Sequence, residues 1–115
     1  MRQAGILAAA GSYALAHHRE RLEEDHANAR AIADRVAAVH GDLVEPAAVT
    51  TNILYVATGV RSATAVAADL AERGVLVGAF GPHLLRLVTH LDVDAAGCRR
   101  AAEALVEALA PSADR

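Results

Sequence analysis

The sequence predicts an α/β (α+β) domain in which a long N-terminal helix is followed by elements in the order β-α-β-β-α. Three observations lead to this prediction. The first 40 residues contain no proline and are rich in Ala, Leu, Arg and Glu, which are strong helix formers. Three short runs of branched or aromatic residues follow, separated by turn residues and helical segments. The 115 residues are enough to fill one compact core.

The N-terminal helical region carries apolar residues at helical spacing. They are Leu15, Leu22, Ala29, Ile32, Val36 and Val39. This period predicts one buried seam and one solvated face. A bend is expected between His17 and Arg21, where the composition changes from small and apolar to charged. The helix is expected to end at Gly41, because Asp42 and Pro46 do not continue it.

The rest of the chain alternates strand and helix signals. Strands are expected at residues 49–56, 75–77 and 85–90. Two helices are expected, from Ser62 or Thr64 to about Arg73 and from Asp92 or Asp94 to about Ala110. A β-α-β unit followed by a hairpin predicts a small three-stranded sheet, antiparallel or mixed, with the last strand in the middle and helices on one face.

The chain is expected to have two parts. Residues 1–40 are interpreted as an interface region and residues 41–115 as a small α/β unit. The Gly- and Ala-rich start of the first helix has no obvious partner inside so small a sandwich. Its partner is therefore expected to lie outside this chain.

Composition excludes several classes of function. The net charge is −3 with both signs interspersed, so no broad basic face is expected for nucleic acid. The apolar run over residues 5–15 is shorter than the roughly 20 residues that span a bilayer, which predicts a soluble, cytoplasmic protein. All eleven basic residues are arginines, so the chain cannot form a lysine Schiff base from its own side chains.

Metal, thiol and phosphate chemistry are not expected either. The six histidines lack partners at the spacings of a metal site. Cys98, the one cysteine, is interpreted as a small buried thiol and not as a nucleophile. The run from Gly78 to Gly81 leads to Pro82 and a hairpin, whereas a phosphate loop leads into a helix N-terminus.

Two arginines are candidates for anion binding. Alternation along the last strand predicts that Arg86 faces away from the helices if Leu87 faces them. Its planar guanidinium suits a carboxylate, either in an intramolecular salt bridge, which spacing alone favours, or on a ligand. His90 shares this face but lies about 13 Å along the strand, too far to bind the same small anion. Arg2 opposes the dipole of the first helix, by chance or because an anion lies nearby.

Several separated blocks resemble one enzyme family. They are residues 1–11 (MRQAGILAAAG), 13–15 (YAL), 21–30 (RLEEDHANAR), 51–53 (TNI) and 85–93 (LRLVTHLDV). In order and spacing these blocks are similar to the C-terminal third of the low-specificity threonine aldolases. The resemblance runs from the first residue to about Leu109.

The resemblance implies a fold, a reaction and roles for two residues. The family has the aspartate-aminotransferase-like fold, with a large domain for pyridoxal 5'-phosphate and a small C-terminal domain. Its members are homotetramers that cleave β-hydroxy-α-amino acids such as threonine or allo-threonine to glycine and an aldehyde. By its match, Arg86 would bind the substrate α-carboxylate, and Arg2 would lie near the cofactor, across the dimer interface. His90 and Asn52 would have structural roles nearby.

The chain also departs from the family pattern. The lysine that binds the cofactor in this family lies upstream of the MRQAG block, and Met1 coincides with an internal methionine. A shortened reading frame or a separated domain is therefore expected, inactive unless a large domain complements it. The alternative is a stand-alone interaction module, without catalysis, that dimerises through its first helix.

Overall fold

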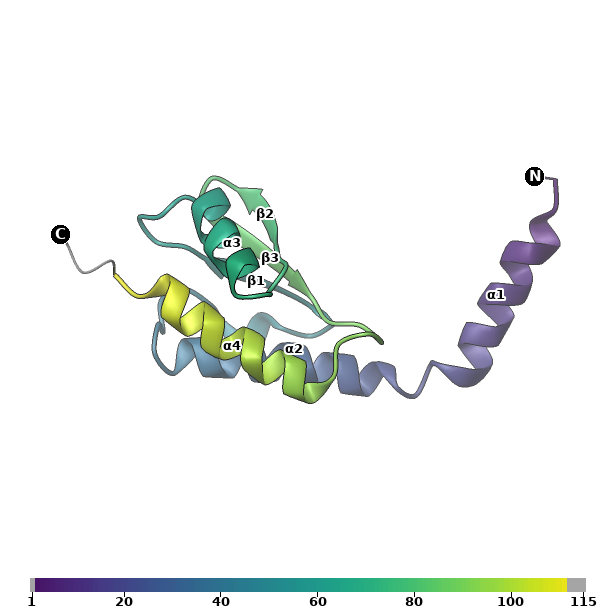
Figure 1. Ribbon diagram of the computed structural model, residues 1–115. Helices are drawn as coiled ribbons and strands as arrows, with labels where there is room; N and C mark the ends of the chain where they lie inside the picture. Colours follow the sequence, from purple (N-terminus) through teal and green to yellow (C-terminus); the bar gives the residue numbers. More distant parts are fainter. Residues whose placement is uncertain (1, 112–115) are drawn as a thin grey trace.

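The computed structural model describes residues 2–111 as four α-helices and three strands (Figure 1). In chain order they are α1 (Ala4–His17), α2 (Leu22–Ala37), a short 3₁₀ helix (Pro46–Ala48), β1 (Ile53–Ala57), α3 (Ala63–Glu72), β2 (Gly78–Gly81), β3 (Leu84–Val88) and α4 (Ala95–Leu109). The mixed α/β class and the element order predicted from the sequence are confirmed.

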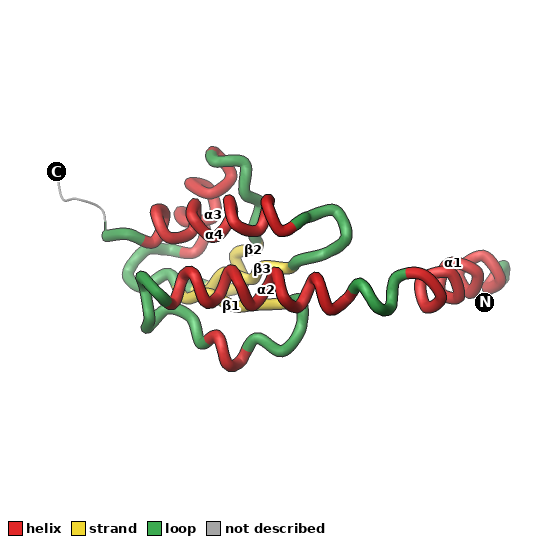
Figure 2. The backbone as a smooth tube through the Cα atoms, turned by 90° about the horizontal axis from the view of Figure 1, so that it is seen from below, coloured by secondary structure: helices red, strands yellow, loops and turns green. Residues whose placement is uncertain are grey.

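The sheet has the strand order β1-β3-β2, and β3 is antiparallel to both neighbours. The predicted position of the last strand in the middle is therefore confirmed. Helices α2 and α4 lie side by side over one face of the sheet (Figure 2), and α3 packs against α4 and β2. No helix within residues 2–111 is both long and apolar enough to cross a membrane.

The core lies between the sheet and the helices. Strand alternation turns Leu54 and Val56 of β1 and Leu85 and Leu87 of β3 toward the helices, where all four are buried. The helices contribute Ile32, Val36, Val66, Leu70, Cys98 and Leu105. Although α2 falls in the region assigned from the sequence to an interface, its central turns belong to this shared core.

The other face of the sheet has no helix over it. We call it the open face; it carries Ile53, Tyr55, Phe80, Arg86 and Val88, all exposed. Four of these five residues are large and apolar, so the open face is an exposed apolar patch whose hydration is unfavourable.

The expected strand at residues 75–77 is wrong, because β2 begins only at Gly78. Helix α3 ends in a Schellman turn: the N–H groups of Gly74 and Val75 donate to the carbonyl oxygens of Ala71 and Leu70, both at 2.9 Å. Gly74 takes the required positive φ of 77°. This turn leads the next residues over the end of the core, where Leu76 is 87% exposed, and away from pairing with β3.

Other boundaries also differ from the prediction. Strand β1 starts at Ile53, because Pro46–Ala48 forms a 3₁₀ helix and the Thr51 hydroxyl accepts a hydrogen bond from the Ile53 N–H. Helix α2 ends at Ala37, before Gly41. Of the expected seam, Ala29, Ile32 and Val36 are buried and Leu15, Leu22 and Val39 are exposed. Only the turns of α2 that face the sheet are covered.

Helix caps settle two of the alternatives left by the sequence. The Ser62 hydroxyl accepts from the Ala65 N–H at the start of α3, and the Asp94 carboxylate accepts from the Gly97 N–H, at 2.7 Å, at the start of α4.

An ion pair joins the two long helices of the sandwich: Arg35 of α2 forms a two-pronged contact with Glu103 of α4 at 2.7 and 2.8 Å. This pairing holds the pKa of the Glu103 carboxyl below its ordinary value.

Helix α1 stands apart from the rest of the molecule. The predicted bend is confirmed: residues 18–21 separate α1 from α2, and α1 projects away from the sandwich (Figure 1). None of its residues is buried. Its large apolar side chains are exposed, namely Ile6, Leu7, Tyr13 and Leu15.

Substitution of Leu85 by Ala tests the position of the core. Leu85 is fully buried on the central strand, so Leu85→Ala should lower the free energy of unfolding by about 2–5 kcal/mol. The measurement is urea denaturation followed by circular dichroism. The matched control is Val88→Ala on the open face of the same strand, with an expected loss of about 1 kcal/mol or less. Equal losses for the two variants would contradict the assignment of the faces.

Candidate functional site

Arg86 lies at the centre of the open face. It is the third residue of the central strand β3, paired in register with Tyr55 of β1 on one side and Gly78 of β2 on the other. Its neighbours Leu85 and Leu87 point into the core, so its side chain points outward. The orientation predicted from alternation is therefore found in the structure.

The guanidinium of Arg86 has no carboxylate partner within residues 2–111. The described residues form ion pairs from Arg21, Arg30, Arg35, Arg61 and Arg73, but none from Arg86. Of the two alternatives, the intramolecular salt bridge is thus not formed among residues 2–111. An arginine on a paired strand, whose five N–H donors form no bond to the described residues, can receive a carboxylate from outside the chain.

Two aromatic rings lie beside this guanidinium. The Arg86 Cζ atom is 5.7 Å from the centroid of the Phe80 ring, within the range of a cation–π contact. The Phe80 and Tyr55 rings are 5.4 Å apart and inclined at 58° to each other. The cation therefore has an aromatic flank on a face that is otherwise apolar.

Sequence reasoning missed both aromatic residues. Tyr55 could have been found, because pairing the first strand with the last in antiparallel register places it opposite Arg86. Phe80 could not, because its position depends on a bulge between Ala79 and Gly81, where the pairing of β2 with β3 shifts register.

The remaining candidates lie outside this site. Asn52 and His90 form hydrogen bonds to backbone groups near the end of β3. The Asn52 Nδ2 donates to the Thr89 carbonyl oxygen at 2.8 Å, and His90 Nδ1 accepts from the Asp92 N–H at 3.3 Å. Arg2 is separated from α1 by the N-cap residue Gln3, and the N-terminal end of α1 points away from the sheet (Figure 1). Within one chain, Arg2 and Arg86 therefore belong to different surfaces.

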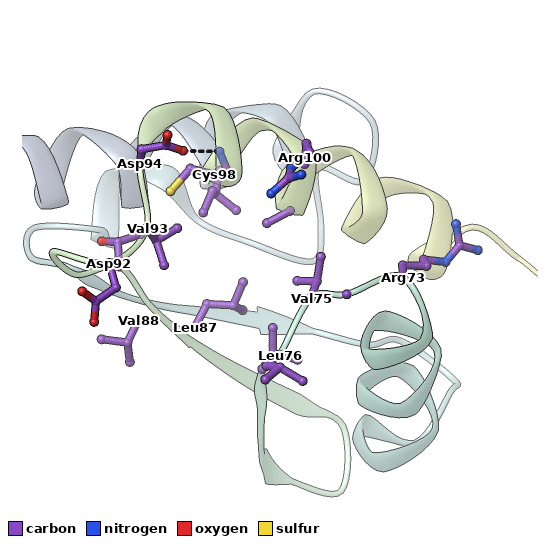
Figure 3. Close-up of a pocket in the computed structure, with 16 residues that line it drawn as sticks. Arg73, Val75, Leu76, Leu87, Val88, Asp92, Val93, Asp94, Cys98 and Arg100 are labelled. Atoms are coloured by element: carbon purple, nitrogen blue, oxygen red, sulfur yellow. Dashed lines mark hydrogen bonds between the residues drawn. The ribbon is translucent and has the colours of Figure 1, made fainter.

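A cavity of about 490 Å³ lies on the helix side, between residues 73–77, the end of β3 and the start of α4 (Figure 3). Of its four charged residues, Asp94 caps α4, Arg73 pairs with Glu107, and Asp92 lies 3.7 Å from His90 Nδ1. The fourth, Arg100, forms no ion pair within residues 2–111. Its wall is mixed: apolar side chains such as Val75, Leu87 and Val93 lie beside these charged groups. Three of the four charged residues at this cavity thus have a contact within the described part of the chain.

Cys98 lines this cavity and is 3% exposed. Burial, and then the nearby Asp94 charge, raise the pKa of its thiol. The thiol form is therefore favoured, which agrees with a packing role and not with a nucleophile. No group of three His, Cys, Asp or Glu side chains within residues 2–111 is arranged to hold a metal ion.

Comparison with known proteins identifies the relatives of this chain. The model of the beta-eliminating lyase family matches residues 1–59. The chain belongs to this family. A low specificity L-threonine aldolase of Escherichia coli K12 is 44% identical over 93 residues, which are 81% of this chain and 26% of that protein. A low-specificity L-threonine aldolase 1 of Arabidopsis thaliana is 33% identical over 93 residues, or 78% of this chain and 26% of that protein.

The chain thus spans about a quarter of the length of the family members it matches. A shorter match, 45% over 56 residues, joins it to a probable low-specificity L-threonine aldolase 2 of Arabidopsis thaliana. The family resemblance seen in the sequence blocks is confirmed.

The residues of this chain do not fit pyridoxal 5'-phosphate, the cofactor that the family resemblance implies. A Schiff base needs a lysine amine, and the sequence contains no lysine. The run from Gly78 to Gly81 forms strand β2 and enters a hairpin, so it does not place backbone N–H groups at a helix N-terminus. No step through the cofactor is therefore assigned to these residues.

The reactivity of Cys98 tests its burial. In the native chain at pH 8, iodoacetamide should alkylate Cys98 about tenfold or more slowly than in urea-unfolded chain, because burial limits access and raises the thiol pKa. Mass spectrometry of timed samples measures the rate, and the single cysteine makes every added mass report on this site. Equal native and unfolded rates would show that the thiol is accessible.

Proposed function

We propose that this chain is the part of a threonine-aldolase-like lyase that binds the α-carboxylate of the amino acid substrate. The reaction is cleavage of β-hydroxy-α-amino acids, threonine or allo-threonine, to glycine and an aldehyde. The observation that carries this proposal is the position of Arg86 at the centre of the open face, without an ion pair among residues 2–111. It lies within a block that resembles the family's carboxylate-binding segment. Membership of the family supports the reaction class.

The geometry at Arg86 suits a carboxylate. A guanidinium presents two parallel N–H donors that match the two oxygens of a carboxylate, which a lysine in the same place could not do. The central strand is hydrogen-bonded on both sides, so the Cα of Arg86 is held firmly. This chain supplies recognition of the acid group.

Cleavage of the carbon–carbon bond is assigned to groups outside this chain, because it lacks the lysine that the family uses. The proposal therefore includes a large domain that holds pyridoxal 5'-phosphate and packs over the open face. Ile53, Tyr55 and Val88 on that face are apolar and exposed, as expected for a surface that such a domain covers. Without it the chain is inactive.

Helix α1 supports a further contact, with a second subunit. A helix that is apolar on all sides is normally buried, yet α1 has no buried residue in the single chain. We infer that α1 lies in the interface of a homo-oligomer, a tetramer if it follows the family. Arg2, at its start, would then lie near the cofactor region of the neighbouring subunit.

The same helix favours the second candidate function, an interaction module without catalysis that dimerises through α1. The two functions differ in what Arg86 does. In the lyase it binds substrate, whereas in the module it has no ligand.

Complementation with a separate large domain tests the lyase proposal. The 115-residue chain, mixed with a fragment of the Escherichia coli threonine aldolase that carries its large domain, should release acetaldehyde from allo-threonine, measured by coupled alcohol dehydrogenase. In this mixture, Arg86→Lys should raise KM about tenfold or more, because a two-pronged contact becomes a point contact.

The matched control for this experiment is Arg99→Lys, the same substitution at an exposed arginine on α4, away from the open face. It should leave KM unchanged. Acetaldehyde release by the wild-type mixture with no effect of Arg86→Lys would remove Arg86 from the site. No release from any mixture would favour the interaction module.

The inferred interface at α1 predicts that the chain associates with itself through this helix. Sedimentation velocity of the 115-residue chain should show a sedimentation coefficient that rises with concentration. The double variant Ile6→Gln, Leu15→Gln should shift the chain toward monomer, because both side chains are 72% exposed in the single chain and need an apolar partner. Val60→Gln, at an exposed apolar residue outside α1, is the control. A wild-type chain that stays monomeric at all concentrations would contradict the interface.

A further inference from the structure

We propose that Phe80 and Tyr55 are positioning residues, which hold the Arg86 guanidinium in the orientation in which it receives a carboxylate. The inference rests on the carboxylate-binding role proposed above for Arg86. It adds two residues that the sequence did not indicate: Phe80, which lies beside the cation, and Tyr55, which lies against Phe80.

The need for positioning follows from the arginine itself. An arginine side chain has several freely rotating bonds, and ordering it on ligand binding costs conformational entropy. The ion-paired arginines of this chain are ordered by carboxylates, such as Glu103 for Arg35. Arg86 has no such partner among the described residues, so another contact must order it if it is to bind with a defined geometry.

Phe80 supplies that contact. Its ring lies 5.7 Å from the Arg86 Cζ atom and covers one flank of the guanidinium. A cation over a ring is attracted to the ring's negative face, and this attraction leaves the N–H donors at the guanidinium edge free. An ion pair would order Arg86 equally well but would occupy the donors that the substrate needs.

The backbone of β2 is shaped to bring the ring there. Gly78 pairs with Arg86, and Ala79 with Leu85, but Gly81 pairs with Leu84, which leaves Phe80 as the extra residue of a bulge. A bulge re-aims the side chain it contains. Gly78 lies opposite Arg86 and carries no side chain, so the β2 residue that pairs with Arg86 leaves space beside the guanidinium.

Tyr55 holds the Phe80 ring in turn. It lies opposite Arg86 on β1, and its ring is 5.4 Å from the Phe80 ring in a tilted arrangement that aromatic pairs favour. The two rings thus meet above the strand that carries the cation.

The contact is not explained by the fold alone. Phe80 is 58% exposed and Tyr55 44% exposed, and neither belongs to the core. Two large rings on a solvent face contribute little to core packing, but they shield the guanidinium from water on one flank. A carboxylate that binds there meets a cation that is fixed and partly desolvated, which strengthens the ion pair.

The first experiment observes the guanidinium directly and does not depend on catalysis. In ¹⁵N-labelled 115-residue chain, the Arg86 Nε–Hε resonance, assigned with Arg86→Lys, should be shifted by the Phe80 ring. Phe80→Leu should move it to the position of a solvent-exposed arginine, and Phe80→Tyr should retain the shift. Tyr13→Leu is the control, because Tyr13 is equally exposed, at 58%, but lies on α1. Circular dichroism checks that each variant folds.

The second experiment measures the consequence for the substrate in the complemented mixture. Phe80→Leu should raise KM for allo-threonine about two- to fivefold, the change that an exposed cation–π contact corresponds to, with kcat nearly unchanged. Phe80→Tyr should restore KM. Val60→Ala, at a fully exposed loop residue, is the matched control that should change neither constant.

The outcomes separate this inference from the proposed function. An Arg86 resonance that does not respond to Phe80→Leu overturns the positioning role, whether or not the mixture is active. A resonance that responds, with KM unchanged in an active mixture, overturns the link to carboxylate binding. Absence of activity in the wild-type mixture refutes the proposed function, and with it the carboxylate as the group for which Arg86 is positioned.

Discussion

The helices of this structure cover only one face of the sheet, and the position of the candidate site depends on this constraint. Three antiparallel strands turn alternate side chains to opposite sides, and α2, α3 and α4 cover only one of them. Leu54, Leu85 and Leu87 on that side form the core. Every residue of the opposite side therefore remains on the surface, and Arg86 is placed at its centre by the same alternation that buries its neighbours.

Alternation and local chemistry were enough to predict much of this arrangement. The strand pattern around Leu87 predicted the outward direction of Arg86, and the caps at Ser62 and Asp94 were among the predicted residues. These features depend on contacts between residues close in sequence. The central place of the last strand followed from the short connections of the β-α-β unit and its hairpin.

Two features were missed for different reasons. The branched residues at 75–77 have strand propensity, but a local feature, the Schellman turn at Gly74, directs them over the end of the core. The contact of Phe80 with Arg86 needs both the pairing of β2 with β3 and a bulge of one residue. Propensity describes single residues, whereas register and bulges are properties of strand pairs.

Recognition and bond cleavage can be separated between polypeptide parts because they make different demands. Recognition of an acid group needs a cation with free donors on a firm backbone, and this small sandwich provides one at Arg86. In the proposed reaction, cleavage needs a lysine-bound cofactor, and this chain contains no lysine. An arginine left without a carboxylate on an apolar, uncovered face is of little use to an isolated domain. Under the proposed function it receives a carboxylate from a second surface, and this is why the open face is the site proposed for recognition.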